Sequence, residues 1–316
     1  MKSSHLSQIL TKYQCADMEV KGEIKDDMFL FGEAGQFEID IASNLEIKIK
    51  AYQLVYNIYR MPEIDYADEH QSKMWYSLFN ANPSTITLVV KNKLLNKIVA
   101  TLTIVLDTEL GLPMKESYPN QIEKLRSKRK RCAEIISLGF DKSALGSCEI
   151  MVQLFKFSYL ITRNIYQATD FLIMIKPRHA SFYVKKLAFE QIGNEVICKK
   201  IKNKPVALFR LNLVEAEKKA QREIDEETVE LKYNKGIFKS FVEAQNSTLL
   251  MNKLREKVLK SEMTINDLEY LFIESKEIFQ KSSSEKIFNI SKMYRNKNTQ
   301  EFLRRCAYDY SNENVD

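Results

Sequence analysis

Apolar and polar positions along the chain follow two different periods, and the change of period separates predicted strands from predicted helices. Residues 37–41 alternate apolar and polar side chains, as a half-buried strand does. Apolar side chains then recur at every third or fourth position, at Leu45, Ile49, Tyr52, Tyr56 and Tyr59. This spacing predicts an amphipathic helix.

The middle of the chain continues as a mixture of strands and helices. Two β-branched runs, 85–90 and 97–107, are separated by a short polar link and predict a hairpin. A short helix around 75–79 precedes this hairpin, and a basic helix follows it. The remaining predicted elements are strands at 132–140, 170–175, 192–199 and 205–213, and helices at 149–165 and 178–187.

The order of these elements is β-α-α-β-β-β-α-β-α-β-β. Parallel strands need a long crossover, and the helix predicted at 149–165 supplies one between strands 132–140 and 170–175. An antiparallel meander that leads into a parallel crossover resembles the topology of GNAT acyltransferases. The expected fold class is therefore α/β (α+β), with a central mixed sheet flanked by helices.

Three zones follow from this pattern. Residues 1–36 are mixed and polar, and they end in a glycine-bearing stretch that suits a linker. Residues 37–213 form the predicted acyltransferase domain. Residues 214–316 form a predicted helical C-terminal extension, in which Thr264-x-x-Asp267 and Ser282-x-x-Glu285 match capping boxes that open helices.

Composition narrows the class of protein. The chain has 316 residues, 45% of them hydrophobic, which is enough for a sizeable core and excludes wholesale disorder. The formal net charge of +6 is mild. It falls short of the dense basic stripe of a nucleic-acid binder, but it suits an acidic protein partner or a peripheral contact with an anionic membrane.

Cysteine, histidine and hydropathy patterns favour a reduced cytosolic protein without a metal. The five cysteines are scattered and lack metal-site spacing, so they are expected to be reduced thiols that pack as small hydrophobes. The three histidines show no ligand spacing either, and no metal is expected. The N-terminus lacks the apolar stretch of a secretory signal, and no window is apolar enough to span a membrane. The expected location is the cytoplasm.

Glu134 is the main candidate for chemistry. Acyl transfer to an amine needs a group that removes a proton from the nitrogen, and donors that stabilise the developing oxyanion. Glu134 stands alone in the apolar strand 132–140, just before the crossover helix, where burial of a carboxylate is costly. The alternative is that Glu134 faces solvent or pairs with an arginine.

The acyl donor is predicted from a missing motif. Residues 138–147 lack the glycine-rich loop that usually holds the CoA diphosphate at the start of the crossover helix. This favours an acyl carrier protein as donor, with no cofactor on the enzyme itself. Acyl carrier proteins are acidic, and a cluster of basic side chains could attract one: Lys124, Lys128, Arg129, Lys130 and Arg131. The alternative is a solvated basic turn without a partner; nucleic acid is disfavoured because few aromatic side chains interleave with these charges.

A second segment of interest runs from Pro177 to Tyr183. Proline at its start is typical of a helix N-terminus. His179 within it could transfer protons, or it could simply be a polar residue of the first helical turn.

Two motifs of this chain, Gly111-Leu112-Pro113-Met114 and Pro177-Arg178-His179-Ala180-Ser181-Phe182-Tyr183, occur together with Ala133-Glu134. This combination resembles the FeeM-like N-acyl amino acid synthases, related to the autoinducer synthases, over about residues 37–213. The resemblance implies transfer of a long-chain acyl group from acyl carrier protein to the α-amine of an amino acid, with Glu134 as general base.

The same resemblance implies roles for further residues. Asp107 and Arg126 would form the pocket or orient substrate. Arg178 and His179 would also contact substrate, and Phe182 and Tyr183 would line the acyl or carrier side.

The chain departs from the family pattern at Ser137, where an arginine is expected, and the residue that binds the substrate carboxylate therefore stays unassigned. Three alternatives remain open: a non-catalytic acyl-binding or regulatory module, an acyl-homoserine lactone synthase, and a CoA-dependent acyltransferase.

Overall fold

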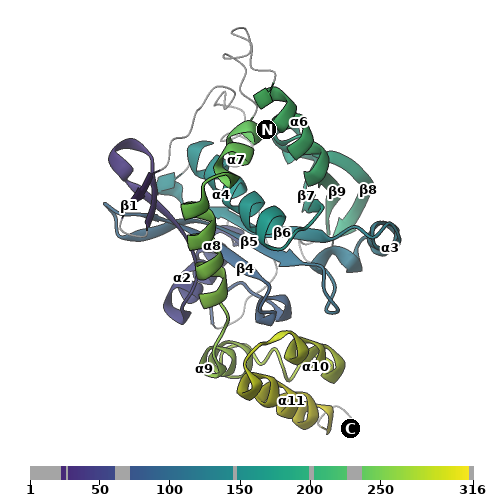
Figure 1. Cartoon of the computed structure of the whole chain (residues 1–316). Coiled ribbons are helices and arrows are strands. Elements are labelled where there is room, and N and C mark those ends of the chain that lie inside the picture. The colour runs from purple at the N-terminus through teal and green to yellow at the C-terminus, as the bar shows by residue number, and fades with distance from the viewer. Residues whose placement is uncertain are drawn as a thin grey trace.

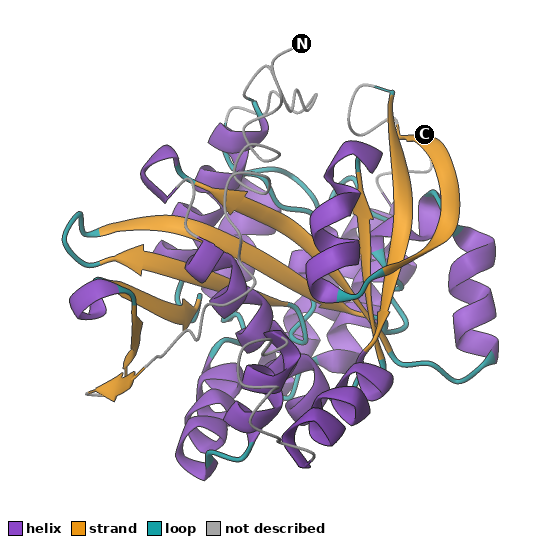
Figure 2. Ribbon diagram, turned by 90° about the horizontal axis from the view of Figure 1, so that it is seen from above, coloured by secondary structure: helices purple, strands orange, loops and turns teal. Residues whose placement is uncertain are grey.

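The computed structural model describes residues 23–25, 28–60, 72–144, 148–198, 203–225 and 237–312. Its strands form one sheet in the order β1-β2-β3-β4-β5-β6-β7-β9-β8, with helices on both faces (Figures 1 and 2). The strands are β1 (Glu23–Lys25), β2 (Met28–Phe31), β3 (Phe37–Ile41), β4 (Ile86–Asn92), β5 (Lys97–Leu106), β6 (Cys132–Phe140), β7 (Asp170–Ile175), β8 (Glu190–Cys198) and β9 (Lys204–Asn212).

Neighbouring strands run antiparallel throughout this sheet, except that β6 and β7 are parallel. The connection between them is α4 (Cys148–Tyr159), which continues as a π-helical turn over Leu160–Ile165. The mixed sheet and its single parallel crossover are therefore confirmed.

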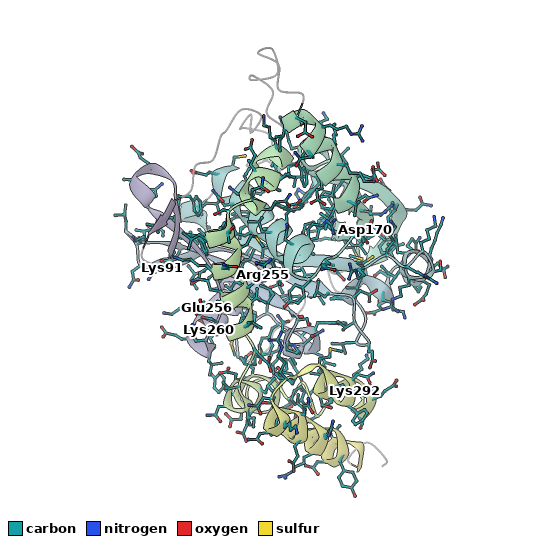
Figure 3. The ribbon with its side chains drawn as sticks, viewed as in Figure 1. Lys91, Asp170, Arg255, Glu256, Lys260 and Lys292 are labelled. Carbon is teal, nitrogen blue, oxygen red and sulfur yellow. The ribbon has the colours of Figure 1, made fainter. Side chains whose placement is uncertain are left out.

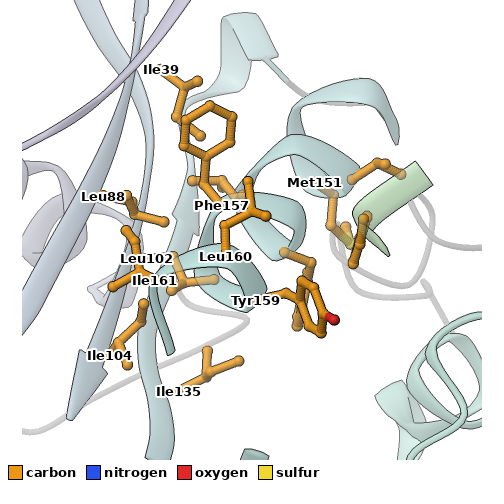
Figure 4. Close-up of a cluster of buried hydrophobic side chains, with 14 of the residues drawn as sticks. Ile39, Leu88, Leu102, Ile104, Ile135, Met151, Phe157, Tyr159, Leu160 and Ile161 are labelled. Carbon is orange, nitrogen blue, oxygen red and sulfur yellow. The ribbon is translucent and has the colours of Figure 1, made fainter. Parts of the chain in front are cut away.

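The helices of the middle zone form where the apolar spacing predicts them. They are α2 (Leu45–Tyr59), α3 (Pro119–Ser127), α4 and α5 (Ala180–Leu187). Asn44 starts α2, because its side chain accepts a hydrogen bond from the backbone N–H of Ile47. The apolar face of α4 and of the π-helical turn packs on the sheet, where Leu160 and Ile161 lie beside strand residues such as Leu102 (Figure 4). This packing forms the main core.

The sheet extends across the predicted boundary at residue 36/37. The apolar run 28–31 forms β2, which pairs with β3, and the Phe29 ring lies 5.1 Å from that of Phe157 on α4. The glycine-bearing stretch is the tight turn between these strands rather than a linker. Gly32 has φ 81°, and a Cβ there would lie 2.8 Å from the Phe37 ring.

The C-terminal zone divides into two parts. The helices α6 (Leu213–Asp225), α7 (Ile237–Gln245) and α8 (Thr248–Lys260) pack against the main core through side chains such as Phe241 and Leu254. Residues 263–312, called here the C-terminal unit, contain α9 (Ile265–Leu268), α10 (Ser284–Met293) and α11 (Lys297–Asn312). The apolar core of this unit is distinct from the main core but takes in residues of the middle zone such as Tyr76, and the unit lies beyond the end of α8 (Figure 1).

One of the two predicted capping boxes is confirmed. Thr264 and Asp267 exchange hydrogen bonds at the start of α9. The second is wrong, because α10 begins at Ser284 after Ser283, and the Ser282 hydroxyl donates to the Ile278 carbonyl instead. None of the helices in the described ranges is long and apolar enough to cross a membrane.

The cysteines agree with the prediction in part. Cys132, Cys198 and Cys306 are free and buried, as expected for small hydrophobes. Cys148 is disulfide-bonded, which corrects the prediction that every cysteine is reduced. Scattered spacing in a sequence cannot reveal which thiols folding brings together.

Candidate active site

Strands β6 and β7 separate in the middle of the sheet. They pair at only three positions, Cys132 with Asp170, Ala133 with Phe171, and Glu134 with Leu172. The paired end is fixed by Asp170 (labelled in Figure 3), a fully buried carboxylate that accepts a hydrogen bond from Arg210 Nε at 2.6 Å. Glu134 therefore stands at the last pair before the strands part.

A β-bulge in β6 lies just beyond Glu134. Thr103 pairs with Ile136 and Thr101 pairs with Gly139, so two residues of β6 face one residue of β5. Ser137 has φ 53°, in the left-handed region. Such a bulge removes backbone groups from the ladder and redirects the strand. The position of the expected arginine is thus the bulged residue of the strand.

Glu134 is buried, with 2% of its surface exposed, so the solvent-facing alternative is wrong. Its Oε2 accepts a hydrogen bond from the backbone N–H of Met114 at 2.9 Å. Met114 belongs to the Gly111–Met114 motif, which lies close to β6 although it is about 20 residues away in sequence. The motif thus holds the carboxylate in place.

Glu134 lies in the wall of a cavity of about 310 Å³, a size typical of ligand pockets. Most of the wall is aromatic or aliphatic. It consists of Tyr59, Trp75, Tyr76, Ser77, Phe79, Asn80, Pro113, Glu134, Ile135, Ile136, Ser137, Met174, Cys198 and Val206. No lysine or arginine of the described residues is among them, so the cavity suits an apolar chain beside one carboxylate.

Sequence reasoning missed the contribution of residues 75–80 to this cavity. The segment is only in part the predicted short helix, a 3-10 turn over Leu78–Ala81. The signal was present in the density of aromatic side chains around Trp75. Their shared orientation towards Glu134, some 55 residues away, depends on packing.

Asp107 and Arg126 pair with each other. Arg126 donates from Nε to Asp107 Oδ2 at 2.8 Å and from Nη2 to Oδ1 at 2.5 Å. This contact, more than any other, raises the pKa of the Arg126 guanidinium above its usual value. Neither side chain lines the cavity. The pair instead joins α3 to the end of β5, where the loop to Met114 begins.

The predicted docking residues surround the C-terminal end of α3. Lys124, Lys128, Arg129 and Arg131 are exposed and Lys130 is half-buried. Arg131 precedes β6 directly and lies three residues, about 10 Å along a strand, from Glu134. The cluster therefore flanks the site at its paired end.

The segment at 177–183 lies apart from the cavity. Arg178 is exposed and its Nε donates to His179 Nε2 at 3.3 Å. His179 Nδ1 is buried and has no hydrogen-bond partner among the described residues. Burial, followed by the charges of Arg178 and Lys176, lowers the pKa of His179 to about 4, so its ring is neutral.

Phe182 and Tyr183 pack in the main core. Their rings lie 5.5 Å apart, and the Tyr183 ring lies 5.9 Å from that of Phe189. Burial raises the pKa of Tyr183. The contacts of these residues and of Arg178 and His179 with substrate stay predictions.

The described residues contain no group of three or more His, Cys, Asp or Glu side chains arranged to hold a metal ion. The expectation that the enzyme needs neither metal nor cofactor stays a prediction.

Comparison with known proteins identifies a matching family and solved structures with a similar fold. The family model of the N-acyl amino acid synthase FeeM matches residues 50–212, just over half of the chain. A solved structure of FeeM, an N-acyl amino acid synthase from uncultured soil microbes, is 23% identical with a TM-score of 0.50, and the match covers 58% of this chain and 94% of that one. The AHL synthase LasI is 13% identical with a TM-score of 0.42, over 56% of this chain and 89% of that one. No curated protein matches the chain.

Proposed function

Because the chain belongs to the N-acyl amino acid synthase FeeM family, it is an N-acyltransferase with a GNAT-like fold, and we propose that it moves a long-chain acyl group from an acyl carrier protein to the α-amine of an amino acid. The family resemblance drawn from the sequence motifs is confirmed. The identity of the acyl donor, a carrier protein, and of the acceptor, the α-amine of an amino acid, is what we propose here.

The observation that carries the proposal is the buried carboxylate of Glu134 in a cavity whose wall is mostly aromatic or aliphatic. A long acyl chain gains free energy from apolar surroundings, at about 25 cal/mol for each Å² removed from water. The reacting amine needs a group that takes its proton. Glu134 is the one acidic side chain among the described residues that line this cavity.

The reaction follows from this arrangement. Glu134 accepts a proton from the ammonium group of the amino acid, directly or through water, and the free amine attacks the thioester carbonyl carbon. Backbone N–H groups that the bulge at Ser137 frees from the ladder are candidates to stabilise the oxyanion. The intermediate then collapses with cleavage of the C–S bond; the nitrogen gives up its extra proton as the amide forms, and the departing thiolate takes up one proton, so the protons of this step balance.

Two observations support a carrier protein as the donor. The basic cluster after Lys124 is exposed beside the start of β6, where it can attract an acidic partner. The chain also lacks a glycine-rich diphosphate loop between Leu138 and Ser147; residues 145–147 lie outside the described ranges.

Replacement of the base tests the proposal. In Glu134→Gln, transfer from acyl-loaded carrier protein to amino acids should fall about 10²- to 10⁴-fold, because the amide cannot accept the proton. Mass spectrometry of the acyl-amide product measures this loss. Glu256→Gln, a change of an exposed glutamate on α8, is the matched control and should leave turnover unchanged.

Unchanged turnover in folded Glu134→Gln would remove Glu134 from the mechanism. The same assay with acyl-CoA in place of the loaded carrier tests the donor, and equal turnover from both would contradict the carrier preference.

A further inference from the structure

The C-terminal unit packs directly behind the aromatic wall of the cavity. Its core includes Met74, Tyr76 and Ala81, which belong to the segment that lines the cavity or adjoins it. Lys292 on α10 also lies 3.5 Å from Glu109, near the loop that leads to Met114 (Figure 3). Residues about 200 positions apart in sequence therefore share one core.

Hydrogen bonds hold the wall in place from behind. The Tyr76 hydroxyl donates to the Leu271 carbonyl, and the Tyr294 hydroxyl donates to the Ala81 carbonyl at 2.9 Å. Lys276 Nζ lies 3.4 Å from the Met74 carbonyl and 5.2 Å from the centre of the Tyr76 ring. Both ends of segment 74–81 are thus tied to the C-terminal unit by buried side chains.

An aromatic column continues from the wall into the unit. The Tyr76 ring stacks on Tyr52 at 4.9 Å and meets Phe272 edge-on at 5.5 Å, and Phe272 stacks on Phe279 at 5.2 Å. Tyr76 lines the cavity, whereas Phe272 is fully buried behind it. The Tyr76 ring is therefore part of the wall here, and the Phe272 ring packs behind it.

The unit lies outside the part of the chain that the family shares. The family match ends at residue 212, and the FeeM structure is 94% covered by a match that takes in only 58% of this chain. The wall behind Tyr76 is therefore a feature of this chain in addition to the family fold.

We propose that the C-terminal unit determines which acyl chains the cavity accepts, with Tyr76 and Phe272 as the specificity-determining pair that limits acyl length. The inference rests on the proposed function, since it assigns the aromatic end of the cavity to the acyl chain. A smaller side chain at either position opens space towards the unit, so longer acyl chains gain apolar contacts that the wild-type protein denies them.

Phe272→Leu tests this from behind the wall, and Tyr76→Leu tests it at the wall itself. The measured quantity is kcat/KM for a 16-carbon acyl chain divided by kcat/KM for a 12-carbon chain, both on carrier protein. This ratio should rise about tenfold or more in each variant, because each methylene group that gains apolar contacts changes kcat/KM by about tenfold or more. Phe288→Leu is the matched control, because Phe288 lies in the same unit but is 43% exposed. Its ratio should equal that of the wild type.

Binding of free fatty acids gives a second readout that does not depend on catalysis. Displacement of a fluorescent fatty acid by chains of 10 to 18 carbons should show the same shift towards longer chains in Phe272→Leu. If Phe272→Leu shows this binding shift relative to the wild type but neither protein transfers an acyl group, the result would contradict the proposed function and leave the inference standing. A folded Phe272→Leu with wild-type length preference in both assays would overturn the inference.

Discussion

Glu134 and His179 are ionisable side chains in two different kinds of site. Glu134 has a backbone N–H donor from Met114 and an adjoining cavity. His179 has a buried Nδ1 without a partner among the described residues, and Arg178 donates to its other nitrogen. The first arrangement suits proton transfer to a ligand in the cavity. The second keeps an imidazole neutral next to two cationic side chains.

The neutral state of His179 predicts a pH dependence of stability. Its pKa is lowered from 6.5 to about 4, so between these values the unfolded chain binds a proton that the folded protein does not. The free energy of unfolding should therefore fall as the pH drops through this window. Between pH 7 and pH 5 the full linkage is about 2 kcal/mol, and about 1 kcal/mol is expected because water reaches part of the ring.

Urea denaturation at pH 7 and pH 5 measures this difference for the wild type and for His179→Gln. The variant should lose about 1 kcal/mol less than the wild type over this interval. An equal loss in both proteins would show that folding does not lower the pKa of His179.

At the scale of elements, the loop from β5 to α3 supplies the support for Glu134. The Asp107–Arg126 pair joins the first residue of this loop to the last turn of α3. Gly111 adopts φ 81° between them, a conformation that favours glycine. The Gly111–Met114 motif and Glu134 therefore act together, because the turn at Gly111 brings the Met114 N–H to the Glu134 carboxylate.

Asp107→Asn should therefore affect both stability and activity. Loss of two charge-assisted hydrogen bonds at a carboxylate that is 7% exposed should lower the free energy of unfolding by about 1–3 kcal/mol. Turnover should fall about tenfold, because the Met114 N–H would no longer fix Glu134. Thermal unfolding and product formation measure the two effects.

Glu123→Gln is the control for this loop, since it removes an exposed partner of the same arginine. It should change stability by less than about 0.5 kcal/mol. Full activity in Asp107→Asn would show that the loop keeps its shape without the pair.

At the scale of the whole molecule, the predicted carrier-docking cluster and the C-terminal unit occupy different sides. The helix α3 lies at one lateral edge, whereas α9, α10 and α11 lie below the sheet (Figure 1). A carrier protein on the cluster would therefore dock on a different side of the molecule from the unit.

Charge reversal at Lys124, Lys128 and Arg129 should raise KM for loaded carrier protein about tenfold at low salt, with little change in kcat, because these charges attract the carrier but take no part in chemistry. Higher ionic strength should shrink the difference from wild type. Lys297→Glu with Arg304→Glu, two exposed changes on α11, is the matched control. An unchanged KM in the α3 variant would place the carrier elsewhere.

The sequence by itself determined the elements and the family. Period-two alternation in 37–41 and helical spacing in 149–165 depend on neighbours along the chain, so both could be predicted. The Gly111–Met114 motif and Glu134 were likewise visible as residues. Short-range patterns fail where a segment is too short to show a period. Residues 28–31 are four apolar residues in a row, and they form β2 because they can pair with the edge of β3.

Tertiary structure alone decided how these parts meet. The Met114 N–H reaches Glu134, Asp107 pairs with Arg126, and Tyr76 packs against Phe272, all through contacts between distant segments. Apolar periodicity tells which face of an element is buried but not what it is buried against. For that reason the sequence predicted the C-terminal extension only as helices, and its packing behind the wall of the cavity became visible only in the folded chain.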